Sequence, residues 1–249
     1  MGGLKLKPYE SEFIKDKIKE YNSLIQDNNI NGFTINKEKN KKIKMGYMYE
    51  KELELDIINL KHNENSIMNI SNIEIESSYM FIKYAKGKVG IVGLGLGYVV
   101  NELLKKKEVK EIIVYEKEKE IIDLYKLSFK EDKRLKIINE DAYTVKKEKF
   151  DYFFVDIYNY KLTNQVVEDY KTFNKLHEIK EYLFWGMEHF LLSCKYEEIV
   201  WVYIPELWME ICKAIFTSFQ ESGLLNYYKQ LDEDLVSNIL KEFKEILNE

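Results

Sequence analysis

The stretch Lys88-Val-Gly-Ile-Val-Gly-Leu-Gly-Leu-Gly-Tyr98 decides how the rest of the chain is interpreted. Residues 89–92 form a short, nearly continuous apolar run, which is typical of a buried parallel strand. Gly93, Gly95 and Gly97 follow it, and a loop of glycines lets the backbone pass close to a ligand in conformations that other residues avoid. The stretch therefore predicts a strand that ends in a ligand-binding loop.

A helix and a second strand follow the loop. Apolar residues between 99 and 104 repeat at helical spacing, and the apolar run 112–115 ends in Glu116. A carboxylate at the tip of a second strand can accept hydrogen bonds from both hydroxyls of a ribose. The succession of strand, glycine loop, helix, strand and acid predicts a nucleoside-binding unit. The simpler alternative is a structural turn in an α/β domain that binds nothing.

The glycine spacing separates the classes of nucleoside. Nicotinamide sites usually have the spacing G-x-G-x-x-G, which seats a pyrophosphate on the helix N-terminus. In this chain the third glycine comes one residue early, and Tyr98 stands in the place of the last fingerprint glycine. The G-x-G-x-G spacing suits S-adenosylmethionine better, because that ligand carries no phosphate. A dehydrogenase is therefore the less favoured reading.

Two further strands are predicted at Leu135–Ile138 and at 150–155, with a helix near 121–125. Strands that alternate with helices predict a parallel sheet with right-handed crossovers, and ligands of such sheets bind beyond the carboxyl ends of the strands. One polar or glycine residue follows each of four successive strand ends: Gly93, Glu116, Asp141 and Asp156. We expect them to share one site, although each aspartate alone could simply cap a helix.

Two parts of the chain are predicted. Residues 1–73 are expected to form a helix and a small β-rich element, with strands near 43–49, 53–60 and 67–70 and a basic hairpin turn at 37–44. Residues 74–249 are expected to form an α/β, Rossmann-like, doubly wound and mostly parallel sheet with helices on both faces and a helical C-terminus. A helix over 74–86 should lead into the first core strand.

The C-terminal third is predicted to hold a helical stretch at 161–195, a fifth strand at 198–204 that stops at Pro205, and two amphipathic helices. A sixth and a seventh strand are not evident in the sequence. Either the sheet is truncated or the N-terminal strands supply its far edge. The last helices could pack on the core or form a homodimer contact, and core packing is the more common outcome.

The composition of the chain limits the kinds of partner, metal site and cellular location that we expect. The chain has 249 residues with 43 acidic and 38 basic side chains, a net charge of −5, so charge gives no reason to expect unspecific nucleic-acid binding. Cys194 and Cys212 form neither a metal spacing nor a disulfide framework, and the three histidines are scattered, so we expect no metal site. Without an apolar signal segment or membrane span, a cytoplasmic protein is expected.

The motifs resemble a known family. Residues 93–97, Glu116, Asp141-Ala142 and the segment Phe150-Asp-Tyr-Phe-Phe-Val-Asp156 are similar to class I S-adenosylmethionine-dependent methyltransferases, most of all to their spermidine-synthase-like branch. The lead Met68-Asn-Ile-Ser-Asn-Ile-Glu74 resembles that of uncharacterised methyltransferase-like proteins of bacteria and phages. The resemblance extends over about residues 66–160.

The resemblance implies S-adenosylmethionine as cofactor. It implies that the glycine loop faces the methionine part, that Glu116 holds the ribose, and that Asp141 contacts the adenine amino group with Ala142 beside the ring. The residues expected to bind the cofactor are Gly93, Leu94, Gly95, Gly97, Glu116, Lys117, Asp141 and Ala142. Asp156 would line the place where the methyl donor meets the acceptor.

Three departures from the family pattern limit this implication. Ile91 stands where many methyltransferases have an acid for the ammonium of the methionine part, and Leu96 replaces the aspartate of aminopropyltransferases. The loop after Asp156 has no second acid, whereas a polyamine needs several carboxylates in a desolvated pocket. Methyl transfer is therefore favoured over polyamine synthesis. A non-catalytic protein that binds a nucleoside or a partner on the same fold stays open as an alternative.

Methyl transfer from a sulfonium requires donor and acceptor in line, and sometimes a base for the acceptor proton. Asp156 is the first candidate for that base or for orienting the acceptor, and Tyr158 and Asn159 are candidates for acceptor contacts. Glu74 and Tyr79, from the lead helix, could close the site. The tyrosines could equally be packing residues. The acceptor is not defined by the sequence, and a small molecule is favoured.

Overall fold

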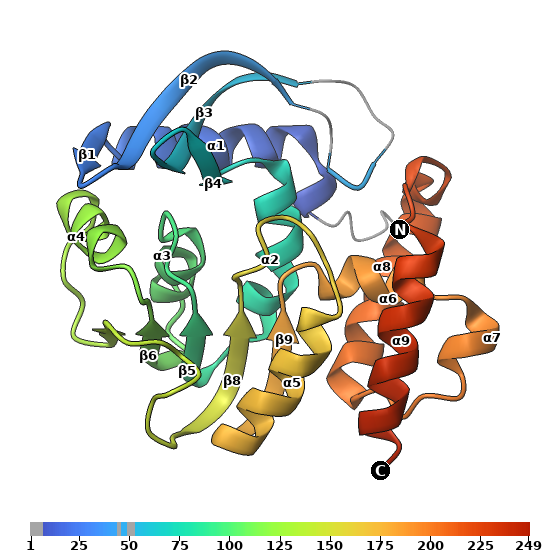
Figure 1. Cartoon of the computed structure of the whole chain (residues 1–249). Helices are drawn as coiled ribbons and strands as arrows, with labels where there is room; N and C mark the ends of the chain where they lie inside the picture. Colours follow the sequence, from blue (N-terminus) through green and yellow to red (C-terminus); the bar gives the residue numbers. More distant parts are fainter. Residues whose placement is uncertain (1–6, 44–45, 49–52) are drawn as a thin grey trace.

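The computed structural model describes residues 7–43, 46–48 and 53–249, and it contains two sheets (Figure 1). An antiparallel sheet has the order β1-β2-β3-β4, and a five-stranded parallel sheet has the order β7-β6-β5-β8-β9. The antiparallel strands are β1 (Asn28–Ile30), β2 (Phe33–Ile43), β3 (Leu53–His62) and β4 (Asn65–Asn69). The parallel strands are β5 (Gly87–Val92), β6 (Val109–Tyr115), β7 (Leu135–Ile138), β8 (Lys149–Val155) and β9 (Glu178–Phe184).

The parallel sheet is doubly wound, as predicted. From β5 the chain moves outward to β6 and β7 through α3 (Tyr98–Leu104) and α4 (Lys119–Ser128), then returns to β8 and moves the other way to β9 through α5 (Gln165–Leu176). Right-handed crossovers in opposite directions put their helices on opposite faces, and α5 lies in front of the sheet with α3 behind it (Figure 1). The strand order therefore switches between β5 and β8.

The carboxyl ends of the parallel strands lie level with one another. Val92 is paired with both Tyr115 and Val155, and Val155 with Phe184, so four strands end at the same height. The residues that follow these strand ends therefore lie along one edge of the sheet. They include Gly93, Glu116 and Asp156, which were predicted to share a site.

Helix α2 (Asn72–Tyr84) precedes β5 and confirms the predicted lead helix. Its Phe81 stacks on Phe154 of β8 at 4.3 Å between ring centres, which anchors the helix to the sheet. The same helix buries the carboxyl groups of Glu74 and Glu76, which are therefore out of contact with bulk water. The domain division at residue 73 stays a prediction.

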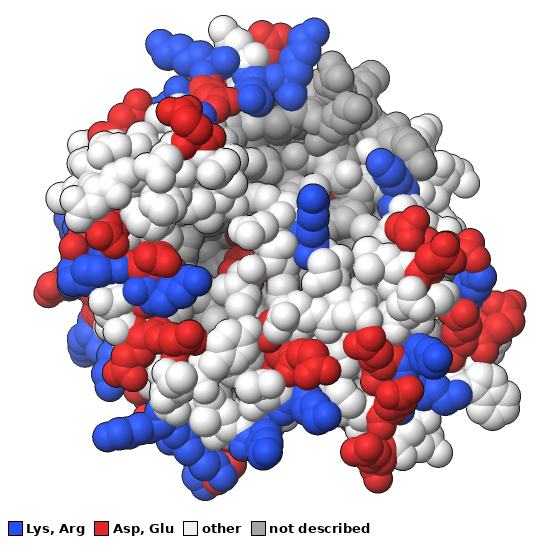
Figure 2. Space-filling model, in the orientation of Figure 1, with Lys and Arg blue, Asp and Glu red and all other residues white. Residues whose placement is uncertain are grey.

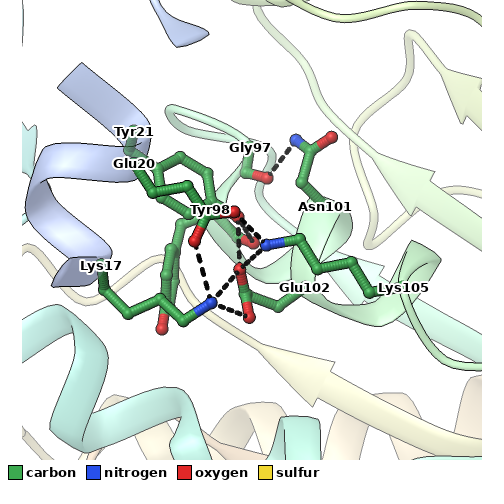
Figure 3. Close-up of polar contacts among 8 residues, drawn as sticks. All are labelled: Lys17, Glu20, Tyr21, Gly97, Tyr98, Asn101, Glu102 and Lys105. Carbon is green, nitrogen blue, oxygen red and sulfur yellow. Dashed lines mark hydrogen bonds and ion pairs between the residues drawn. The ribbon is translucent and has the colours of Figure 1, made fainter. Parts of the chain in front are cut away.

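The antiparallel sheet arches over the carboxyl edge of the parallel sheet, with α1 (Ser11–Leu24) beside it (Figure 1). A polar cluster joins α1 to α3, the helix that follows the glycine loop (Figure 3). Lys17 lies 2.9 Å from Glu102, and Tyr21 donates a hydrogen bond to the same carboxylate at 2.9 Å. Lys105 pairs with both Glu20 and Glu102. The N-terminal element is thus fixed to the helix at the loop.

Two N-terminal predictions were wrong. Residues 37–43 belong to β2 and do not form a basic turn, because this strand is solvent-facing and carries charges that pair across it, as Glu38 does with Lys61 at 3.0 Å. No strand spans 43–49: β2 ends at Ile43, residues 46 and 47 form a turn, and Met48 makes a single bridge to Tyr228. Residues 44, 45 and 49 lie outside the described residues.

The fifth strand was also predicted in the wrong place. It is β9, inside the stretch 161–195 that the sequence predicts to be helical. Its first half alternates exposed Glu178 and Lys180 with half-buried residues, because it is an edge strand, and only its last three residues are fully buried. The apolar run at 198–204 instead forms the short α7 (Tyr196–Ile199) and a turn, with Trp201 70% and Tyr203 77% exposed.

Within the described residues the parallel sheet ends at β9, so it is truncated, and the prediction that N-terminal strands might extend it is wrong. The Trp208 indole N–H donates to the Tyr182 carbonyl on this edge strand at 2.6 Å. Trp208 belongs to α8 (Glu206–Ser222), which packs beside β9 with α6 (Met187–Ser193) and α9 (Glu233–Leu247). Phe243 of α9 lies 5.5 Å from the Trp208 ring, which confirms core packing of the C-terminal helices.

Two 3-10 turns complete the described elements, at Lys7–Tyr9 and Leu224–Tyr227. None of the helices in the described part of the chain combines the length and apolar character needed to cross a bilayer.

Candidate functional site

A cavity of about 640 Å³ lies at the strand-order switch, between the two sheets. In Figure 2 the surface is hollowed there, and acidic atoms are visible inside the hollow. The roof comes from the antiparallel sheet through Phe33, His62 and residues 65–68. The floor comes from the strand tips through Gly93, Gly95, Glu116, Asp141, Ala142, Asp156 and Trp185. Open α/β sheets bind ligands at this position.

The three loop glycines have φ angles of 93°, 50° and 76°, which side chains rarely adopt. A Cβ on Gly93 would press on the Asp156 carbonyl, and one on Gly97 would press on the ring of Tyr125. Gly93 and Gly95 line the cavity, whereas Gly97 does not and instead starts α3. Gly97 is therefore a structural requirement of the loop, and the other two glycines belong to the cavity wall.

Glu116 is buried and turned inward. Its Oε2 accepts the N–H of Leu94 at 2.9 Å, and its Oε1 accepts the N–H of Glu118 at 2.9 Å. Burial raises the pKa of the Glu116 carboxyl, while these two N–H groups oppose the rise. Each carboxylate oxygen has a second lone pair, so the group can still accept hydroxyl hydrogens from a ligand. Lys117, with its side chain 72% exposed, lies at the rim.

The tip after β7 supplies a mixed polar and apolar wall. Asp141 is exposed and accepts the N–H of Tyr143 at 3.0 Å, so it caps its own turn and no helix follows directly. Ala142 beside it is buried, and all three residues line the cavity. These residues therefore form one wall of the cavity, with one oxygen of Asp141 committed to its turn, and their contact with an adenine stays a prediction.

Two carboxyl groups from distant parts of the chain face the same cavity. Glu74 comes from α2 and is 2% exposed, and Asp156 follows β8 and is half-buried. Burial raises the pKa of Asp156 to about 7. Burial first, and then the negative charge of Asp156, holds the pKa of Glu74 well above its usual range, while the Trp185 indole opposes this rise. Among the described lining residues the only lysine is Lys117 at the rim, so no fixed cation compensates the pair.

The loop after Asp156 is conformationally unusual. Asn159 and Tyr160 have φ angles of 47° and 59°, a left-handed region that asparagine tolerates and that is uncommon for a bulky tyrosine. The Tyr160 hydroxyl accepts the N–H of Asn69 at 2.8 Å and donates to its carbonyl at 2.6 Å. The Tyr160 ring meets Trp185 edge-on at 5.4 Å. Asn159 and Tyr160 both line the cavity.

The structure brings most of the predicted site residues together, and separates a few. Tyr79 does not line the cavity: its ring packs on Phe13 at 5.9 Å, so it cannot close the site. Tyr158 is buried beneath the loop and is likewise not a wall of the cavity. The packing alternative is the one that the structure shows for both tyrosines. Leu94 contributes its backbone N–H while its side chain joins the core.

Sequence reasoning missed the roof and one wall. Met68, Tyr160 and Trp185 all line the cavity, yet none was singled out as a site residue. Trp185 follows a strand that was itself misplaced, and it could have been found only with the correct edge strand. Met68 reaches the loop through the antiparallel sheet, a long-range contact without a local sequence signal.

No protein-family model and no curated protein matches the chain. Solved structures with a similar arrangement include a spermidine synthase from Thermotoga maritima, at 14% identity and a TM-score of 0.40, covering 80% of this chain and 62% of that one. An S-adenosylmethionine-dependent methyltransferase from Mesorhizobium loti has 9% identity and a TM-score of 0.35, covering 43% and 52%. A putative RNA methyltransferase from Pyrococcus horikoshii has 18% identity and a TM-score of 0.32, covering 45% and 57%.

The chain therefore spans less than two thirds of the length of these neighbours. At identities of 9–18% the similarity concerns the fold alone.

Proposed function

We propose that this chain is an S-adenosylmethionine-dependent methyltransferase whose acceptor is a basic nitrogen of a small molecule. The observation that carries the proposal is the pair of uncompensated carboxyl groups, Glu74 and Asp156, in the same cavity as the glycine loop and Glu116. The loop and Glu116 support the donor, and the acid pair supports the acceptor.

The residues present fit the donor. Gly93 and Gly95 place backbone on the cavity wall, and Glu116 offers free lone pairs on a buried carboxylate, which suits the two hydroxyls of a ribose. Ala142 offers a small apolar surface to a flat ring. When bound, S-adenosylmethionine would supply an electrophilic methyl group on a positively charged sulfur.

The acid pair fits a cationic acceptor. Burial raises the pKa of both carboxyls, and the negative charge of Asp156 raises the pKa of Glu74 further. An ammonium group between them would relieve both the repulsion and the desolvation. Trp185 and Tyr160 present aromatic rings to the same space, and such rings attract cations.

Asp156 is suited to take the acceptor proton. With a pKa of about 7 it is partly ionised near neutral pH, and a general base works best when its pKa lies near the working pH. In its ionised form it would remove a proton from the ammonium and leave the nitrogen with the free electron pair that methyl transfer needs. Glu74, better buried and with the more strongly raised pKa, would stay protonated and orient the acceptor by accepting one of its N–H groups on the carboxyl's carbonyl oxygen.

One observation favours a second candidate, aminopropyl transfer. The sequence shows no second acid in the loop after Asp156, but the fold supplies one in Glu74. The acceptor chemistry would be the same, and only the donor would differ. The two functions are therefore separated by the donor that binds.

Calorimetric titration with four ligands tests the donor: S-adenosylmethionine, its demethylated product, its decarboxylated form, and NAD. We expect the first two to bind, and we expect Glu116→Ala to weaken them at least about tenfold, since a buried acceptor of two hydroxyls is lost. Glu120→Gln is the matched control, because Glu120 lies on the same segment outside the cavity. Binding of NAD alone, or of none of the four, would overturn the proposal.

The acceptor class is tested with methyl-labelled donor and a panel of primary and secondary amines set against alcohols and carboxylic acids of similar size. Label should pass to the amines only, and Asp156→Asn should abolish the transfer while leaving donor affinity within about twofold. Label transfer to an acid or alcohol, with no transfer to amines, would contradict the role of the acid pair.

A further inference from the structure

Met68 of strand β4 sits on the glycine loop. The N–H of Leu96 donates to the Met68 sulfur at 3.1 Å, and a Cβ on Gly95 would overlap that same sulfur atom. The room that Gly95 leaves open is therefore filled by a side chain of the protein itself. Met68 also lines the cavity, so it separates part of the loop from any ligand there.

A β-bulge brings Met68 to this position. Leu60 of β3 pairs with Met68, but the next residue, Lys61, pairs with Ser66, so Ile67 is the extra residue on β4. In a regular strand neighbouring side chains point to opposite faces, whereas here Ile67 and Met68 both line the cavity. Bulges are common next to active sites, where they redirect a side chain.

The contact is of a kind that can be exchanged. A thioether is a weak hydrogen-bond acceptor, and a methionine side chain has three rotatable bonds with which to move aside. Strand β4 has β3 as its only partner in the described sheet, so it can shift without breaking a second ladder. A carboxylate is a much stronger acceptor for a backbone N–H than a thioether is. A ligand that brings a carboxylate to Leu96 would therefore displace Met68.

We propose that Met68 is a specificity-determining residue that competes with the amino-acid end of the donor for Leu96 and Gly95. This inference rests on the proposed function and assigns a step to it: the nucleoside part binds at Glu116 with Met68 in place, and the amino-acid part binds only after the thioether has left the loop. Ile91, buried in the sheet at the position before Val92, offers that part no acidic partner. The backbone N–H that Met68 now occupies is thus the group for which such a ligand must compete.

Two ligands that differ only at this end test the competition. S-adenosylhomocysteine carries the amino-acid part, and 5′-methylthioadenosine lacks it. For the Met68→Ala variant we expect S-adenosylhomocysteine to bind about 3- to 10-fold more tightly than to the wild type, since both the weak hydrogen bond to Leu96 and the bulk over Gly95 are gone. The affinity for 5′-methylthioadenosine should stay within about twofold.

Met68→Leu is the matched control because it keeps the bulk and loses the acceptor. It should leave the space at Gly95 filled, so S-adenosylhomocysteine should gain clearly less than it does with Met68→Ala. Amide hydrogen exchange of Leu96 in the free protein should quicken in both variants, which confirms the contact without any ligand. Circular dichroism would verify that both variants are folded.

Equal gains for the two nucleosides in Met68→Ala, or no gain for S-adenosylhomocysteine, would overturn this proposal and leave the proposed function standing. Failure of both nucleosides to bind the wild type and both variants would overturn the proposed function and this inference together. An unchanged exchange rate at Leu96 would show that the hydrogen bond to the Met68 thioether is not formed in solution. The proposed competition for the Leu96 N–H would then be refuted.

Discussion

The free energy of unfolding of this protein should fall as pH rises toward 8. Part of this fall comes from the titration of one buried carboxyl group, Glu76, and can be measured by replacing that residue. Glu76 lies on α2, is 1% exposed, and accepts the N–H of Tyr47 at 3.1 Å. Glu188 of α6, also buried, adds a second acidic group nearby. Burial raises the pKa of each of these two carboxyls from 4.5 to about 8.

The magnitude follows from proton linkage. Between pH 4.5 and 8 the folded state keeps a proton on Glu76 that the unfolded chain has released. The stability that this proton provides is complete below pH 4.5 and is lost as pH rises through 8. The free energy of unfolding should therefore fall by about 1.4 kcal/mol per pH unit for this group. Over two pH units the loss amounts to about 3 kcal/mol.

Glu76→Gln removes this titration and keeps the shape and the acceptor for Tyr47. Urea unfolding of the wild type and the variant at about pH 5.5 and about pH 7.5 gives the two free energies. We expect the difference between them to move by about 3 kcal/mol in favour of the variant at the higher pH. Glu188 is present in both proteins, so its own titration largely cancels.

Glu12→Gln serves as the control, since Glu12 is exposed and the Lys15 ammonium holds the pKa of its carboxyl low, below the window tested. Its difference from wild type should be the same at both pH values. If the difference in free energy of unfolding between wild type and Glu76→Gln were also the same at both pH values, Glu76 would be ionised in the folded protein and the reasoning would be refuted.

Three further outcomes are expected. The kcat/KM for methyl transfer should rise as pH rises through about 7, because Asp156 must lose its proton to act as a base, and a flat pH profile would contradict that role. Gly97→Ala should lower the free energy of unfolding by about 1–3 kcal/mol, because φ is 76° and the new methyl group would press on Tyr125, and an unchanged urea midpoint would contradict the strain. Trp208→Phe should lower it by about 1–3 kcal/mol, since the Tyr182 carbonyl loses its donor in a buried site, as thermal or urea unfolding can measure.

The core of the site was predictable because its signals are local. The strand before Gly93, the acid at Glu116 and the acid at Asp156 all follow short apolar runs that can only be central strands, and level strand ends bring them together. A parallel sheet fixes this convergence without any knowledge of side-chain contacts. The doubly wound architecture followed from the same few segments.

The rest of the site depends on long-range packing, and the sequence could not supply it. Glu74 and Asp156 were each predicted as site residues, but their pairing joins a helix to a strand tip far along the chain and was not predicted. β9 was missed because three of its first four residues are charged, so it lacks the continuous apolar run by which the central strands were found. The apolar run 198–204 was predicted to be a buried strand, but its large side chains Trp201 and Tyr203 are exposed on the surface.

The free edge of β9 has a consequence for behaviour in solution. An unpaired strand edge can recruit a strand from another molecule, and natural proteins oppose this with charges and covering side chains. Here the charged Lys180 of β9 pairs with Asp151 of the neighbouring β8 at 2.5 Å, and the Trp208 indole occupies the Tyr182 carbonyl. Any change that moves α8 away from β9 would expose an unpaired strand edge on which a strand of another molecule could add. The C-terminal helices therefore protect the protein from fibril-like association.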